Sequence, residues 1–295
     1  MSLLLFATAS LLAMQANGQP VADADQTGGS EIVVEGRRDR AKEIRDFVDH
    51  LTADVGQDGQ LMRFDLAICP GVTGLPRHQK VVVSQRMRRV ASTAGLPLGK
   101  DGCRPNAILI VANDKNEMKD ALFKRYPAFF VDSDNKVHRP LPERGGALLW
   151  YVTKYLDADG RLAGATVRGR ASRVTPVTQP KFARSVLIVE SKATAGLTTT
   201  QLADYAAMRL FANARPEDLI GSTAPTIMTV LDAPMDSSVP LTLTEWDLGF
   251  LKGLYAMPDG LYQNIARGSI RKSLNHHLET TADAARQEEV HPIGR

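Results

Sequence analysis

The chain has 295 residues, of which 43% are hydrophobic and 23% are charged. This composition is typical of a folded globular protein, and it excludes a coiled coil, a collagen-like repeat and a chain that is disordered throughout. The net charge of +3 is too small to indicate a nucleic-acid-binding protein.

Residues 1–18 predict an export signal. A short apolar run ends in the small residues Ala16 and Gly18, at the spacing that signal peptidase recognises, so we expect cleavage after Gly18. The run is too short to span a bilayer comfortably, and no other segment approaches transmembrane length. We therefore expect a periplasmic or otherwise exported protein with no transmembrane segment after cleavage. A basic stretch before the run is missing, and the alternative is an apolar helix of the mature fold.

The remaining chain predicts one α+β domain over 39–279, between a flexible lead-in at 19–38 and a polar tail at 280–295. An edge strand at 32–34 is an alternative within the lead-in. The domain begins with a helix that residues 37–40 open and that runs to about residue 54, with one apolar stripe. The residues of that stripe are Ile44, Phe47, Val48 and Leu51.

A strand–helix–strand unit follows in the N-terminal half. We expect a strand over 64–69 that Pro70 and Gly71 end, a helix over 77–94, and a second strand over 106–112. The second strand is apolar on both faces, which predicts a central position in the sheet.

The elements after this unit complete a mixed sheet and a helical C-terminal half. Asp114 is placed to cap a helix that Pro127 ends, with Glu117 reaching back to the cap. A strand, a turn and a returning strand are expected at 147–155, 157–160 and 165–174, then a loop at 175–182 and a strand at 184–191. The last expected elements are helices at 199–213, 223–232, 244–257 and 260–278.

The two cysteines, Cys69 and Cys103, predict a disulfide, because an even number of cysteines in an exported chain favours pairing. With the first strand at 64–69, Cys69 follows one parallel strand and Cys103 precedes the next. The bond then requires the 95–105 loop to fold back across the end of the sheet. Two free buried thiols are the alternative.

Asp204 is the polar residue that most needs an explanation, because the segment 198–213 is apolar almost all round and predicts a buried helix. Asp204 is either a carboxylate in a functional site or a carboxylate bonded to backbone amides or an arginine, and the second interpretation is favoured. Capping likewise explains Gln201 after Thr198 and Asp247 after Thr244.

No catalytic, cofactor-binding or metal-binding motif is present. The six histidines lack metal-ligand spacing, apart from His276 and Glu279 on the last helix, where an exposed polar helix end is favoured over a metal site. The basic helix at 77–94 is interpreted as a solvated face rather than a nucleic-acid groove, since no aromatic residues interleave with its cations. Gly71 and Gly74 weakly suggest an anion site, and a tight turn explains them equally well.

Several phrases carry a resemblance: FDLAICPGVTGLP, MRRVASTAGLPLGKDGCRPNAILIV, TTTQLADYAAMRLFANARP and LTEWDLGFLKGLYAM. They resemble a family of uncharacterised exported proteins of Gram-negative proteobacteria, over roughly residues 31–275. The cysteines match those of the family, which favours the disulfide. The resemblance implies no functional residue.

The order of elements also resembles zinc-peptidase (metzincin-like) folds, with the helix at 199–213 at the place of the zinc helix. If Gln201 stands at the first histidine, Leu202 and Tyr205 stand at the glutamate and the second histidine. These side chains cannot supply the metal ligands or the general base.

The sequence therefore favours an exported, non-enzymatic protein that binds a partner protein or an envelope component, without a cofactor. Two alternatives stay open. One is an inactive or divergent relative of a zinc peptidase, and the other is a hydrolase with an unrecognised site, for example around Asp204.

Overall fold

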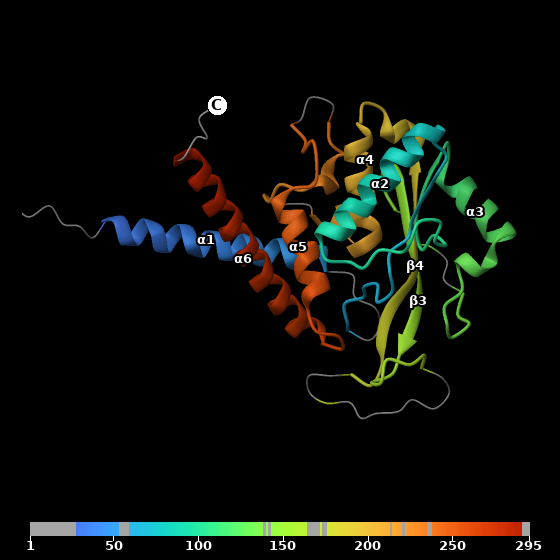
Figure 1. The fold of residues 1–295 in the computed structure, drawn as a ribbon, viewed down its shortest axis with the longest axis horizontal. Coiled ribbons are helices and arrows are strands. Elements are labelled where there is room, and N and C mark those ends of the chain that lie inside the picture. The colour runs from blue at the N-terminus through green and yellow to red at the C-terminus, as the bar shows by residue number, and fades with distance from the viewer. Residues whose placement is uncertain are drawn as a thin grey trace, which may run out of the picture. The chain divides into compact units, whose positions relative to one another are not determined.

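A computed structural model gives the fold (Figure 1). It describes residues 28–52, 59–137, 140, 143–163, 172, 176–212, 214–219, 222–234 and 238–290. The chain divides into two units, Met1–Asp39 and Arg40–Arg295. The described part of the first unit is helical and belongs to α1 (Gly28–Leu51).

Helix α1 begins earlier than the sequence indicates, because residues 28–38 are helical rather than a flexible lead-in or an edge strand. A short apolar run such as 32–34 does not distinguish a strand from a helix by its periodicity. The apolar stripe predicted from Ile44 to Leu51 is confirmed, and all four of its side chains are buried.

The second unit contains a mixed four-stranded sheet in the order β1-β2-β4-β3. The strands are β1 (Pro70–Thr73), β2 (Ala107–Ala112), β3 (Ala147–Leu156) and β4 (Gln179–Glu190). β1, β2 and β4 are parallel, and β3 is antiparallel to β4. The predicted α+β class and the central position of β2 are confirmed.

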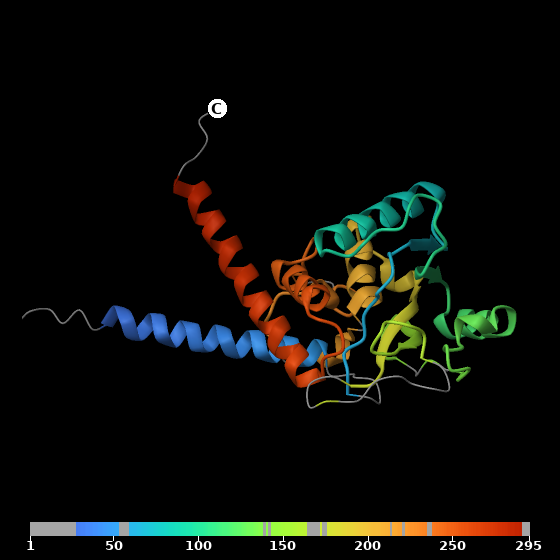
Figure 2. The same cartoon turned by 60° about the horizontal axis from the view of Figure 1, so that its bottom comes forward.

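Helices cover both faces of this sheet. α2 (Arg77–Thr93) and α4 (Thr199–Ala212) lie on one face, and α3 (Lys115–Arg125) lies on the other (Figures 1 and 2). Side chains along β4 alternate between the two faces of the sheet, because successive strand residues point to opposite sides. Leu187 and Val189 join the large core beside α2 and α4, whereas Val186 and Ile188 join a smaller cluster beneath α3.

The first strand is placed wrongly by the sequence. Phe64 and Ile68 form isolated bridges, and β1 begins at Pro70, the residue expected to end it. Proline is tolerated here because Pro70 is the first residue of an edge strand, where a missing N–H breaks no ladder.

The loop predicted at 175–182 is also too long, because β4 begins at Gln179 and includes Pro180. β2 pairs with β4 only from Ser185 onward, so Pro180 has β3 as its strand neighbour on one side alone. The predicted return strand at 165–174 lies outside the described residues except for Ser172, and β4 is the strand that returns beside β3.

The C-terminal half is helical, with corrections at two places. A short 3-10 helix, Ile227–Thr229, replaces the helix expected at 223–232, where Pro225 and Pro234 flank the segment. α6 (Gln263–Val290) continues through most of the expected polar tail, because no glycine or proline follows Gly268 before residue 292.

α5 (Glu245–Ala256) packs against α6 at very short range. A Cβ placed on Gly253 would lie 3.1 Å from both the Cα and the carbonyl oxygen of Ile270. The absence of a side chain at Gly253 therefore allows the two helix backbones to approach each other.

Candidate anion-binding pocket

Cys69 and Cys103 form a disulfide, with their Cα atoms 6.0 Å apart. The predicted bond is therefore confirmed. The sequence places the two cysteines at opposite ends of parallel strands only because it places the first strand too early in the chain. Because β1 begins at Pro70 and β2 at Ala107, both cysteines precede their strands. They lie at the amino ends of two neighbouring parallel strands, which is the same edge of the sheet.

Hydrogen bonds fix the chain around this disulfide. The Asn106 side chain accepts from the Cys69 amide at 2.8 Å and donates to the Ala67 carbonyl at 3.0 Å. The Ile68 amide donates to the Pro97 carbonyl at 2.7 Å, and the Gly99 amide donates to the Ile68 carbonyl at 2.9 Å. The loop between α2 and β2 is thereby attached to the segment that precedes β1.

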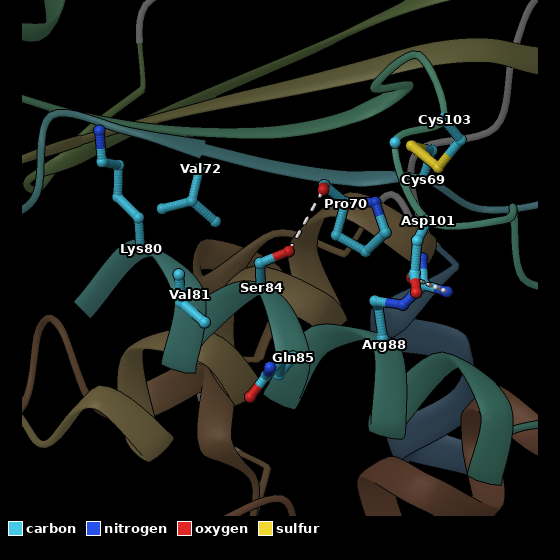
Figure 3. A pocket seen from close by; sticks show the side chains of 11 residues that line it. Cys69, Pro70, Val72, Lys80, Val81, Ser84, Gln85, Arg88, Asp101 and Cys103 are labelled. Carbon is cyan, nitrogen blue, oxygen red and sulfur yellow. Dashed lines mark hydrogen bonds and ion pairs between the residues drawn. A yellow bond between two sulfur atoms is a disulfide. The ribbon is translucent and has the colours of Figure 1, made fainter. Parts of the chain in front are cut away.

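An open pocket of about 390 Å³ lies beside the disulfide, between β1 and α2 (Figure 3). Its lining comes from the start of β1, from one face of α2 and from the loop that carries Cys103. The lining residues are Cys69, Pro70, Val72, Lys80, Val81, Ser84, Gln85, Arg88, Asp101, Gly102 and Cys103.

Three polar side chains of α2 follow one another along this pocket. Lys80, Ser84 and Arg88 are spaced four residues apart, which places them in a row on one helix face. Ser84 donates to the Pro70 carbonyl at 3.4 Å, and Arg88 donates to the Gly99 carbonyl at 2.8 Å. Within the described part of the chain, Lys80 has no salt-bridge partner.

The charge of the pocket wall is predominantly positive. α2 contains no Asp or Glu, and Asp101 is the acidic residue in the lining. The Asp101 side chain is fully exposed and lies 3.6 Å from the Arg88 guanidinium, which makes this a weak, solvent-screened ion pair. Two cations thus flank a hydroxyl group and the apolar side chains of Val72 and Val81, an arrangement that suits an anionic ligand with some apolar surface.

Asp204 lies outside this pocket, and its carboxylate has the kinds of bonding partner that the sequence favours. Its carboxylate is fully buried and accepts from Nε and Nη2 of Arg86, at 2.6 and 2.8 Å. It also accepts from the Thr242 hydroxyl at 2.8 Å and from the Leu243 amide at 2.7 Å. Asp204 therefore has both kinds of partner named in the prediction, an arginine and a backbone amide.

The two predicted caps are confirmed as well. Thr198 and Gln201 bond each other reciprocally at the start of α4, at 3.1 Å in both directions. Thr244 and Asp247 form the capping box of α5. Asp247 is fully buried, and this burial raises the pKa of its carboxyl group against the opposing effect of its hydrogen bonds from Thr226 and Ile227.

A buried ion pair that the sequence analysis missed involves Arg209, in the last turn of α4. Arg209 donates to the Glu143 carboxylate at 2.5 Å and to the Tyr205 hydroxyl at 2.6 Å. Burial raises the pKa of Tyr205 to about 12, so the phenol stays neutral. The available signal was Arg209 itself, since a cation on an all-round apolar helix requires a buried partner. Nothing local in the sequence identifies that partner as Glu143.

The glycines that weakly suggested an anion site are explained by close packing. A Cβ on Gly71 would lie 2.7 Å from Cβ of Pro105, and one on Gly74 would lie 1.8 Å from the Val111 carbonyl oxygen. Gly74 also has a positive φ of 83°, which suits glycine.

The described histidines do not gather around a common point. His277 contacts Glu245 at 2.7 Å, and His138 lies outside the described residues. Among the residues that the structure describes, no three His, Cys, Asp or Glu side chains are grouped as metal ligands. That the protein binds no zinc stays a prediction.

Comparisons with protein-family models, curated proteins and solved structures found no match for this chain. The resemblances to an exported proteobacterial family and to zinc peptidases therefore stay predictions. Within the described ranges, none of the helices combines the length and the apolar character needed to cross a membrane.

Proposed function

We propose that this protein is an exported, non-enzymatic binding protein, and that the pocket beside the disulfide takes an anionic group of a partner protein or envelope component. The row of Lys80, Ser84 and Arg88 along the pocket carries the proposal. Charge-assisted hydrogen bonds from Lys and Arg are the common means by which proteins bind carboxylates and phosphates.

Two further observations support export. The disulfide between Cys69 and Cys103 is compatible with export, because such bonds form and persist mainly in oxidising compartments such as the periplasm. Residues 1–18 have the apolar run and the small residues of a cleavable signal.

The test is a binding titration of the mature chain with two anionic probes, poly-L-glutamate and vesicles that contain phosphatidylglycerol. We expect wild type to bind at least one probe at low salt, and Lys80→Glu to weaken that binding about tenfold or more, because it replaces an attraction by a repulsion. The matched control is Lys124→Glu, which makes the same charge change at an exposed position of α3, on the other face of the sheet. Equal losses in both variants, or no binding by wild type, would contradict the proposal.

An inactive or divergent relative of a zinc peptidase is the second candidate. The place of the buried helix α4 in the chain supports it, because α4 follows the last strand of the sheet after one short 3-10 helix. Near-equimolar zinc after dialysis without chelator, together with peptide hydrolysis that a chelator stops, would favour an active peptidase over both proposals.

A further inference from the structure

The pocket lies along an open edge of the sheet. Among the described residues, β1 pairs with β2 and has no strand on its other side. Cys69, Pro70 and Val72 belong to this edge and also line the pocket (Figure 3). A ligand in the pocket therefore lies beside a strand edge that no other described strand pairs with.

The hydrogen bonds show which backbone groups point outward. The Cys69 carbonyl accepts from the Asn106 amide at 3.0 Å, so it points toward β2. Because successive residues of a strand direct their backbone groups to opposite sides, those of Pro70 and Val72 point to the open edge. The bond from Ser84 to the Pro70 carbonyl agrees with this direction. Pro70 has no N–H, so Val72 is the residue of this pair that offers both a donor and an acceptor.

The two cations fit the repeat of an extended chain. Lys80 and Arg88 are eight positions apart on α2, which corresponds to about 12 Å at 1.5 Å per residue. Residues i and i+4 of a strand lie on the same face and about 13 Å apart. Two acidic side chains at this spacing can therefore contact both cations while the backbone between them pairs with β1.

We propose that the occupant of the pocket is an extended acidic segment of a partner protein, which adds to β1 as a further strand through Val72 and places two carboxylates beside Lys80 and Arg88. This inference rests on the proposed function and specifies its ligand. Main-chain bonds to an exposed sheet edge supply affinity in such complexes, and side-chain contacts supply specificity.

The test uses two short peptides of identical composition. In the first, two glutamates are separated by Thr-Val-Thr, which places both on one face of a strand. In the second, the later glutamate is moved one position toward the first, which places the two on opposite faces. We expect the first peptide to bind and the second to bind about tenfold more weakly, because one ion pair is lost.

Hydrogen exchange of the backbone amides distinguishes strand addition from purely ionic binding. A ligand that binds only through its charges does not slow exchange of the outward-pointing amide of β1. We expect the first peptide to slow exchange of the Val72 amide, while the amides of Gly71 and Thr73, which face β2, keep their rates. We also expect Val72→Pro, which removes the outward N–H, to weaken binding of this peptide about tenfold. Thermal melting verifies that the variant folds, and the exchange measurement on wild type does not depend on it.

The outcomes separate this inference from the proposed function. If poly-L-glutamate or anionic vesicles bind through Lys80 but neither peptide protects Val72, the pocket binds anions and the strand-addition proposal is overturned. Equal binding of the two peptides overturns it as well. If no anionic probe binds, both proposals fail.

Discussion

Arg86 of α2 donates two hydrogen bonds to Asp204 of α4, from Nε at 2.6 Å and from Nη2 at 2.8 Å, one to each carboxylate oxygen. The same carboxylate accepts from Thr242 and Leu243, in the segment that leads into α5. One buried side chain thus connects three segments that are distant in sequence.

Asp204→Asn should lower the free energy of unfolding by about 3 kcal/mol, because it leaves Arg86 without its counter-charge at a partly buried position. Urea unfolding measures the change. The control is Asp46→Asn, which breaks the exposed pair between Lys42 and Asp46 and should leave the free energy of unfolding nearly unchanged, because solvent screens this pair. Similar effects from both substitutions would argue against a structural role for Asp204.

Removal of the disulfide by Cys69→Ser with Cys103→Ser should reduce the free energy of unfolding by about 4 kcal/mol, since the bond closes a long loop in the unfolded chain. Denaturant unfolding of the oxidised wild type and of the double variant gives the difference. Wild type treated with a reductant should resemble the double variant. A reductant-insensitive wild type would show that the bond is not formed in the purified protein.

Gly253→Ala should destabilise the protein by about 1–3 kcal/mol, because its Cβ would press on the backbone of Ile270. Gly268→Ala, within α6, is the matched control: no atom lies within 4 Å of the added Cβ. That substitution should stabilise by about 0.5–1 kcal/mol, since alanine is the better helix former. Thermal melts of the two variants should therefore shift in opposite directions, and a shared direction would contradict the close crossing of α5 and α6.

The environment of the Asp259 carboxyl group predicts that the free energy of unfolding falls in acid. Burial opposes ionisation of this carboxyl group, but hydrogen bonds from Lys181 and Arg63 outweigh it and lower its pKa below the ordinary value of 3.8. The folded state therefore binds the proton less tightly than the unfolded state, and the stabilising contribution is fully present above pH 3.8. It is lost as the pH falls through the lowered pKa.

Urea unfolding of wild type and Asp259→Asn at several pH values tests this sign. The variant should be less stable at neutral pH, and the gap between the two proteins should close as the pH falls below 3.8. A gap that stays constant down to that range, or widens there, would contradict the lowered pKa.

The exported product should begin near Gln19. Intact-mass measurement of protein recovered from the periplasm of an expressing bacterium determines its first residue. A full-length product that stays in the cytoplasm would contradict the export signal at residues 1–18.

Local pattern was sufficient for several elements of this fold. The buried stripe of α2 follows the spacing of Val83, Met87 and Val90, and Asp114 accepts from the amides of Asn116 and Glu117 as a capping residue does. Helix periodicity and capping depend on residues within a few positions of one another, so one sequence is enough to recognise them.

Tertiary relationships were not accessible in the same way. The sequence predicts that Pro70 ends a strand, whereas its tolerance at the start of a strand depends on which neighbour pairs beside it. Glu143 gives no local sign that it pairs with Arg209, from which 66 positions separate it. The sequence favours a solvated face for the basic helix that carries Lys80 and Arg88, and only the position of β1 beside that helix forms a pocket.

The disulfide also connects the location of the chain to the shape of its surface. Cys69 and Cys103 are themselves part of the pocket wall, and the loop they hold carries Asp101 and Gly102 on the same wall. Before the thiols are oxidised, this wall is attached to β1 only by non-covalent contacts. If the chain is exported as proposed, this wall acquires its covalent connection only in the oxidising compartment, and a chain in a reducing cytosol carries the charges of α2 beside a wall without it.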